Sequence, residues 1–195
     1  MKKLFSLLAV ICLSVSASAK NDVSTVSGQP SLLNDPSVRM TLKWDYSECK
    51  IEGKSVDAFL KSKGDDWVRD YPGEIAAAEA SFSAFYNKKT KSAVITDDAD
   101  EADYNVVIKV TEFDYGSTGA SVAMSLAFGG FARKAGGASF TGDIYVYKNG
   151  ENASPVAVMH IDNFIGDGDV SNTARRTNAY FQFAKEFVKY LKKQK

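Results

Sequence analysis

Few residues in this chain are suited to acid–base or nucleophilic catalysis. His160 is the only histidine and lies in an apolar segment, where it could act as a general base only beside a nucleophile. No serine occupies a G-x-S-x-G elbow, and Cys49 lacks the signature of a cysteine nucleophile. We interpret His160 as a strand histidine with a satisfied ring and Cys49 as a small buried hydrophobe, and we expect no catalytic residue.

Phosphate, metal and cofactor sites have equally little support. The glycine-rich stretches contain neither G-x-x-x-x-G-K-[ST] nor G-x-G-x-x-G. The acidic run from Asp97 to Asp103 could hold calcium, but it lacks the spacing of an EF-hand loop, so we interpret it as a solvated turn. We expect neither a metal nor a cofactor. Paired carboxylates could still serve glycoside hydrolysis, which keeps a hydrolase as the least favoured function.

Two groups of residues are candidates for contact with a partner. Arg175 and Arg176 fall in the first turn of a predicted C-terminal helix, where they oppose the helix macrodipole and could bind an anion or a partner carboxylate. The second group lies in or beside a basic connection between two Gly-Gly pairs. The candidate interaction residues are Phe128, Phe131, Arg133, Lys134, Arg175 and Arg176.

The segment from Ser117 to Ala138, which contains that connection, has two interpretations. Large residues alternate with small ones from Val122 to Phe128, which indicates a strand. The stretch also fits helical spacing, and its Ala, Leu and Met residues favour a helix. With the strand that follows, it has the length of a transmembrane hairpin of about nine residues per strand, although we favour a hairpin packed on its own domain.

Alternating apolar residues predict the strands that must position these groups. Apolar residues take the even positions from Tyr104 to Val110, as in a half-buried strand. The apolar phase moves to odd positions after Thr111, so we predict a β-bulge near Thr111-Glu112. In the strand that starts at Phe140, the even-numbered apolar residues share one face. Further strands are predicted at 39–47, 92–96 and 155–165.

Capping residues and helical spacing predict three helices. Ser55 caps a short first helix. The second helix begins at Pro72 and ends near Lys89. The closing helix is capped by Asp169 or Ser171 and carries a broad apolar stripe, which we assign to the core.

The first 19 residues have the anatomy of a secretory signal peptide. Lys2-Lys3 precede the apolar run 4–15, and Ala17-Ser18-Ala19 fits a cleavage site. Ile11 precedes Cys12 where a lipobox usually has a small residue, so a periplasmic or secreted protein is favoured over a lipoprotein. The predicted organisation is a signal peptide at 1–19, a flexible leader at 20–37 and a single α+β domain at 38–195.

The charge balance of the exported chain argues against nucleic acid as a partner. Cleavage after Ala19 removes two of the 24 basic residues and none of the 24 acidic ones, which leaves a formal charge of −2. Cys49 then remains as the only cysteine, so no intrachain disulfide can form. A chain of this length can bury a sufficient core without such a crosslink.

The order of these elements resembles that of a group of small bacterial envelope proteins. Two short motifs carry the resemblance, Ala102-Asp103-Tyr104 and the turn from Tyr147 to Gly150, and it spans residues 38 to 193. The group includes the curli-secretion lipoprotein type and related uncharacterised periplasmic families. In the curli relatives, hairpins that follow such strands build an oligomeric pore, and the resemblance supplies no catalytic residues.

We therefore expect an α+β fold with a largely antiparallel sheet of four to five strands and two or three helices packed on one face. The expected function is that of a non-catalytic, exported binding or accessory protein of the cell envelope. Its partner would be a protein or another envelope component, and membrane contact is not favoured. The alternative is an oligomeric envelope-assembly or pore subunit that uses the 120–147 hairpin.

Export predicts a defined N-terminus. Produced in a bacterium with a secretory pathway, the protein should be recovered outside the cytoplasm with Lys20 as its first residue, because the A-x-A pattern directs cleavage after Ala19. Intact-mass spectrometry with N-terminal peptide mapping measures this. A mass that includes residues 1–19, or a lipid-modified Cys12, would show the signal to be misassigned.

Overall fold

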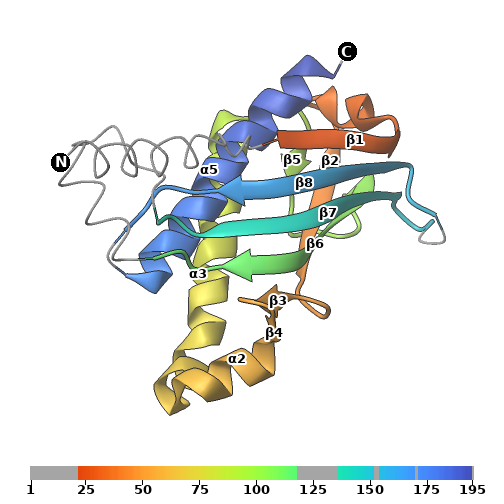
Figure 1. The fold of residues 1–195 in the computed structure, drawn as a ribbon. Helices are drawn as coiled ribbons and strands as arrows, with labels where there is room; N and C mark the ends of the chain where they lie inside the picture. Colours follow the sequence, from red (N-terminus) through yellow and green to blue (C-terminus); the bar gives the residue numbers. More distant parts are fainter. Residues whose placement is uncertain (1–21, 118–135, 152–153, 170, 195) are drawn as a thin grey trace, which may run out of the picture.

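Three strands with strict alternation form the centre of the fold. The computed structural model describes residues 22–117, 136–151, 154–169 and 171–194. In it, β6 (Tyr104–Asp114), β7 (Ser139–Lys148) and β8 (Ala157–Ile165) pair antiparallel (Figure 1). Even-numbered residues of β7 from Phe140 to Val146 are buried and odd-numbered ones are half-buried, which confirms the predicted faces.

The predicted bulge is present in β6. The β6–β7 register shifts between Val110 and Glu112, so one extra residue of β6 keeps Phe113 and Tyr115 on the buried side. The β7–β8 register shifts beside it, between Phe140 and Gly142. Two neighbouring irregularities therefore bend the sheet at the same end.

The predicted sheet was wrong in strand number and direction, whereas the α+β class is confirmed. The described residues form an eight-stranded mixed sheet with the order β1-β8-β7-β6-β2-β5, and β3 and β4 lie off this path. β2 (Arg39–Asp45) runs parallel to β6 and to β5 (Val94–Ile95). β3 (Lys50–Ile51) is parallel to β6 and antiparallel to β4 (Lys54–Ser55).

Physical reasons account for both errors. The chain leaves β2, passes through the helical layer and returns to the same sheet, and such a crossover connects parallel strands. Strands β3 and β4 have two residues each, too short for a period of two to appear in the sequence, whereas β5 falls within the strand predicted at 92–96.

Residues of the expected flexible leader form an edge strand. β1 (Asp22–Gly28) pairs antiparallel with β8, and a 3-10 helix, η1 (Pro30–Asn34), follows it and buries Pro30 and Leu33. Backbone pairing holds this polar strand, so it has no hydrophobic periodicity to detect. The predicted signal peptide lies outside the described residues.

Three α-helices complete the described fold. Ser55 caps α2 (Val56–Lys63) and Ser171 caps α5 (Asn172–Lys193), each by accepting a hydrogen bond from the backbone N–H three residues later. α3 (Asp65–Lys89) begins directly after α2, earlier than predicted, with Pro72 inside it. The proline removes one helical hydrogen bond but does not end the helix here.

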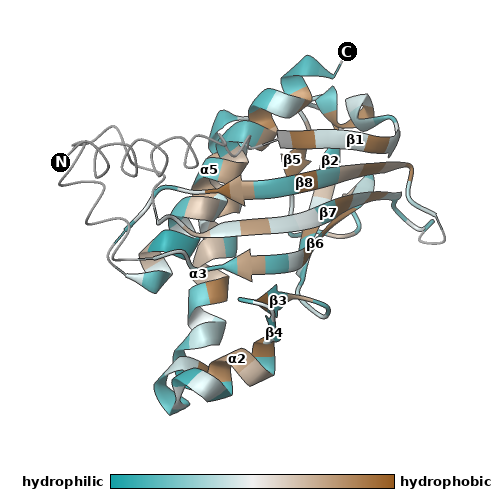
Figure 2. Ribbon diagram, in the orientation of Figure 1, coloured by the Kyte–Doolittle hydropathy of each residue, from teal (hydrophilic) through white to brown (hydrophobic). Residues whose placement is uncertain are grey.

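The two long helices pack against one face of the sheet (Figure 1). Figure 2 shows bands of hydrophobic and hydrophilic residues along β8, as expected for a strand with one buried face. Trp44 of β2 meets Phe82 of α3 and Tyr180 of α5, with ring centroids 5.4 and 4.6 Å apart. Among the helices of the described ranges, none combines the length and apolar composition needed to cross a membrane.

Close backbone packing at Gly166 gives a stability prediction. A Cβ at this position would lie 2.4 Å from the Cα of Ala179 in α5, so Gly166→Ala should lower the free energy of unfolding by about 1–3 kcal/mol. Gly73→Ala, in open space inside α3, should raise it by about 0.5–1 kcal/mol. Urea denaturation measures the free energy of unfolding of both variants. Equal changes in the two variants would contradict the close packing at Gly166.

Candidate functional site

The face of the sheet opposite α3 and α5 carries the polar and aromatic side chains that the core does not use. No helix among the described residues covers this face, which we call the outer face (Figure 1). Its residues come from strand positions that alternate with buried ones. They are Lys43, Asp45, Val107, Lys109, Asp143, Tyr145, Tyr147, Val158 and His160.

A charged row crosses the outer face. Asp45, Lys109, Asp143, His160 and Ser24 are successive register partners on β2, β6, β7, β8 and β1. The Nδ1 of His160 lies 2.7 Å from an Asp143 carboxylate oxygen, so the histidine ring has a partner, as the sequence indicated. The row lies on the open surface, and both side chains of this pair are partly exposed.

This row has the residue types of a Ser-His-Asp triad without its connections. A serine nucleophile must be within hydrogen-bond reach of its histidine, with donors placed for the oxyanion. Among the described residues, Ser24 makes no hydrogen bond to His160. In the described part of the chain, the row therefore lacks the Ser–His hydrogen bond of such a triad.

An aromatic row lies next to the charged row. Val107, Tyr145 and Val158 are register partners on β6, β7 and β8. The ring of Tyr147 stacks with that of Tyr145 at a centroid distance of 6.4 Å. All four side chains are half-buried. Tyrosines that combine an apolar ring with a wet hydroxyl are enriched at protein interfaces.

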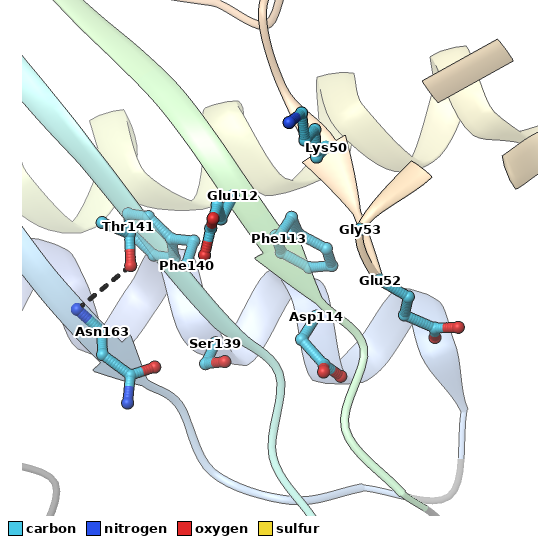
Figure 3. A pocket seen from close by; sticks show the side chains of 10 residues that line it. All are labelled: Lys50, Glu52, Gly53, Glu112, Phe113, Asp114, Ser139, Phe140, Thr141 and Asn163. Carbon is cyan, nitrogen blue, oxygen red and sulfur yellow. Dashed lines mark hydrogen bonds between the residues drawn. The ribbon is translucent and has the colours of Figure 1, made fainter. Parts of the chain in front are cut away.

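A cavity of about 340 Å³ occupies the bulged end of the outer face (Figure 3). The irregular pairing of β6, β7 and β8 shapes it, and the β3–β4 turn forms its far wall. The backbone N–H of Asn163, a residue with a positive φ of 38°, donates to the Thr141 hydroxyl at 3.3 Å. The lining residues are Lys50, Glu52, Gly53, Glu112, Phe113, Asp114, Ser139, Phe140, Thr141 and Asn163.

Metal ligation is not supported by the described part of the chain. No group of three or more His, Cys, Asp or Glu side chains there is arranged to hold a metal ion. In the acidic run, Asp98 accepts the backbone N–H of Asp100 and Asp103 accepts that of Arg39. These two carboxylates stabilise a turn and the start of β2.

Arg176, a predicted interaction residue, lies in the core. Its Nε donates to Glu74 of α3 at 2.6 Å, and its Nη2 donates to the Tyr115 hydroxyl at 2.9 Å. The guanidinium lies 3.7 Å from the centroid of the Phe113 ring. Its side chain is 1% exposed and that of Glu74 9%. The carboxylate that pairs with this arginine belongs to the same chain.

This buried cluster connects α3, α5 and the end of β6. Tyr115 also donates to Glu74, at 2.7 Å. Burial opposes the charge on Arg176, but the surrounding tyrosines and the Glu74 carboxylate outweigh it and raise the pKa of the guanidinium. Arg176 precedes Tyr180, Phe183 and Phe187 on the apolar stripe of α5, which is the sequence signal for its burial.

The other predicted interaction residues have different positions. Arg175 is also buried; it donates to the Asp169 carbonyl at 3.1 Å and contacts the Asn172 side chain. Phe128, Phe131, Arg133 and Lys134 lie outside the described residues. The sequence did not single out the outer face, because most of its residues appear as the polar half of each alternation and Val107 and Val158 look like exceptions to it.

The buried pair gives a second stability prediction. Arg176→Met should lower the free energy of unfolding by about 3–5 kcal/mol, because the Glu74 charge would stay buried without its partner. Thermal or urea unfolding measures this, and Arg69→Met, which removes exposed ion pairs from α3, is the control with little expected change. Adding Glu74→Gln to Arg176→Met should recover part of the loss. Equal loss in single and double variants would contradict the pairing.

Comparison with known proteins finds only partial similarity of fold. No protein-family model matches this chain, and no curated protein matches it. A PelC dodecamer from Paraburkholderia phytofirmans is 13% identical with a TM-score of 0.42, over 83% of this chain and 94% of that one. A point variant of that dodecamer is 12% identical with a TM-score of 0.40, over 84% and 93%. Similarity at this level does not establish a shared function.

Proposed function

We propose that this protein is an exported, non-catalytic binding or accessory protein of the bacterial cell envelope, which binds a protein partner on its outer face. The observation that carries this proposal is the outer face itself. On one continuous surface it combines tyrosine rings, a charged row and a cavity. Such mixtures of aromatic anchors and polar surroundings are typical of protein interfaces.

The charges at the bulged end of the outer face favour a partner with basic groups. Near its bulged end, the exposed carboxylates of Glu112, Asp114 and Asp162 have no ion-pair partner among the described residues. Lys109 is already paired with Glu48 at 2.6 Å. A surface with excess negative charge attracts basic segments and disfavours acidic ones such as nucleic acids.

Export from the cytoplasm fits the sequence and the one cysteine that remains after the predicted cleavage. The signal peptide anatomy directs the chain to the secretory pathway. Cys49, the cysteine that follows the predicted cleavage site, is 4% exposed, and burial raises the pKa of its thiol to about 11. A buried thiol of this kind resists oxidation outside the cytoplasm.

Occupancy of the outer face can be tested by cysteine labelling. Val107→Cys should react with a maleimide about tenfold more slowly in the envelope of the bacterium that makes the protein than after purification, because a bound partner covers it. Lys88→Cys, on the exposed side of α3, is the matched control and should react at similar rates in both settings. The buried Cys49 contributes little background.

Equal rates for Val107→Cys in both settings would contradict a bound partner. The solution mass of the purified protein identifies a second copy as occupant: a multimer in which position 107 is still protected would favour the oligomeric assembly subunit instead. A monomer with position 107 exposed only after purification supports a separate partner protein.

A further inference from the structure

The cavity at the end of the outer face is open on the solvent side and closed at its base. Phe113 and Phe140 also line it, but their rings are only 2% and 1% exposed and pack into the core on the other side of the sheet. Ser139, Thr141 and Asn163 provide hydroxyl and amide oxygens on the β7–β8 side. A ligand that enters would therefore meet mainly polar and charged side chains.

The charged groups around the cavity are mainly carboxylates with unused capacity. Glu112 is in no ion pair among the described residues. One oxygen of Asp114 accepts the Gly116 N–H at 2.6 Å, and its other oxygen has no hydrogen-bond partner among those residues. Glu52 is 3.9 Å from Lys63 in a half-exposed, weak pair. Lys50 is the opposing charge, so the lining has three carboxylates and one ammonium.

Lys50 offsets only part of the negative charge of the three carboxylates. It is the register partner of Glu112 across β3 and β6, yet the two side chains form no ion pair. Figure 3 shows Lys50 at one edge of the cavity, with Asp114 and Glu52 toward the other edge. The region near Glu112 and Asp114 is therefore the most suited to a positive group.

A lysine or arginine side chain matches this arrangement. Its long flexible stem lets the charged end reach acceptors inside a cavity while the backbone stays at the surface. An ammonium has three donors and a guanidinium five, and neither accepts hydrogen bonds. The carboxylates and hydroxyls of the wall supply acceptors of the required kind.

We propose that this cavity receives a lysine or arginine side chain from the protein partner of the outer face. The inference rests on the proposed function, since it assigns the chemistry by which that partner is recognised. The charged group binds between Glu112 and Asp114, and the flanking backbone of the partner lies along the outer face toward Tyr145.

Three probes test this assignment by NMR titration of the purified protein: a blocked Val-Lys-Val tripeptide, the same peptide with norleucine for lysine, and n-butylammonium. The lysine peptide should shift the backbone amides of residues 112–114 and 139–141 with a dissociation constant on the order of 1 mM. Glu112→Gln should weaken it by about tenfold, because a charge-assisted hydrogen bond is lost. Glu48→Gln, an exposed acid on the same face but outside the cavity, should change it by less than about twofold.

The other outcomes overturn the assignment. A norleucine peptide that binds as well as the lysine peptide would exclude recognition of charge. Butylammonium that binds as tightly as the peptide would show that the backbone on either side of the lysine contributes nothing, which contradicts the proposed course of the partner along the outer face. An unchanged affinity in Glu112→Gln would place the binding elsewhere. If no peptide binds while position 107 stays protected in the envelope, the cavity assignment is wrong and the proposed function stands. If position 107 is not protected in the envelope while the lysine peptide still binds, the proposed function is wrong and the cavity still binds a lysine side chain.

Discussion

The fold depends on one buried ion pair, between Arg176 of α5 and Glu74 of α3. Both side chains are almost fully buried, and Tyr115 at the end of β6 bonds to each of them. A charge in such an environment is stable only with its partner, so the pair fixes how the two long helices approach each other and the sheet. Around it, the rings of Trp44, Phe82 and Phe183 fill the space between sheet and helices.

Because the helices are fixed on one side, the opposite side of the sheet is left for function. Alternation places the same number of side chains on each face, and the outer ones cannot join the core. The bulge in β6 and the irregular pairing of β7 with β8 bend the sheet locally, more sharply than regular pairing would. That bend creates the cavity beside Glu112, so the feature that keeps Phe113 in the core also shapes the candidate binding site.

The sequence predicts those parts of the structure that depend on local patterns. Alternation located β2, β6, β7 and β8, and the phase change after Thr111 located the bulge. Ser55 and Ser171 marked helix starts through a side-chain oxygen that any nearby N–H can use. Strand direction, the edge strand β1 and the register that brings Asp143 to His160 depend on pairing across long stretches of chain, which periodicity does not encode. The burial of Arg176 does not follow from its charge, which is typical of an exposed residue. Its position on the apolar stripe of α5 is the local signal for burial.

The central claim is that the outer face holds a protein partner. Photo-crosslinking from a benzoylphenylalanine placed at Tyr145 tests it most directly in the intact envelope, with the same residue at Lys88 on α3 as the reference. The account predicts one discrete protein adduct from position 145, lost when Glu112→Gln is added and absent from position 88. The same adducts from both positions, or none from 145, would contradict it.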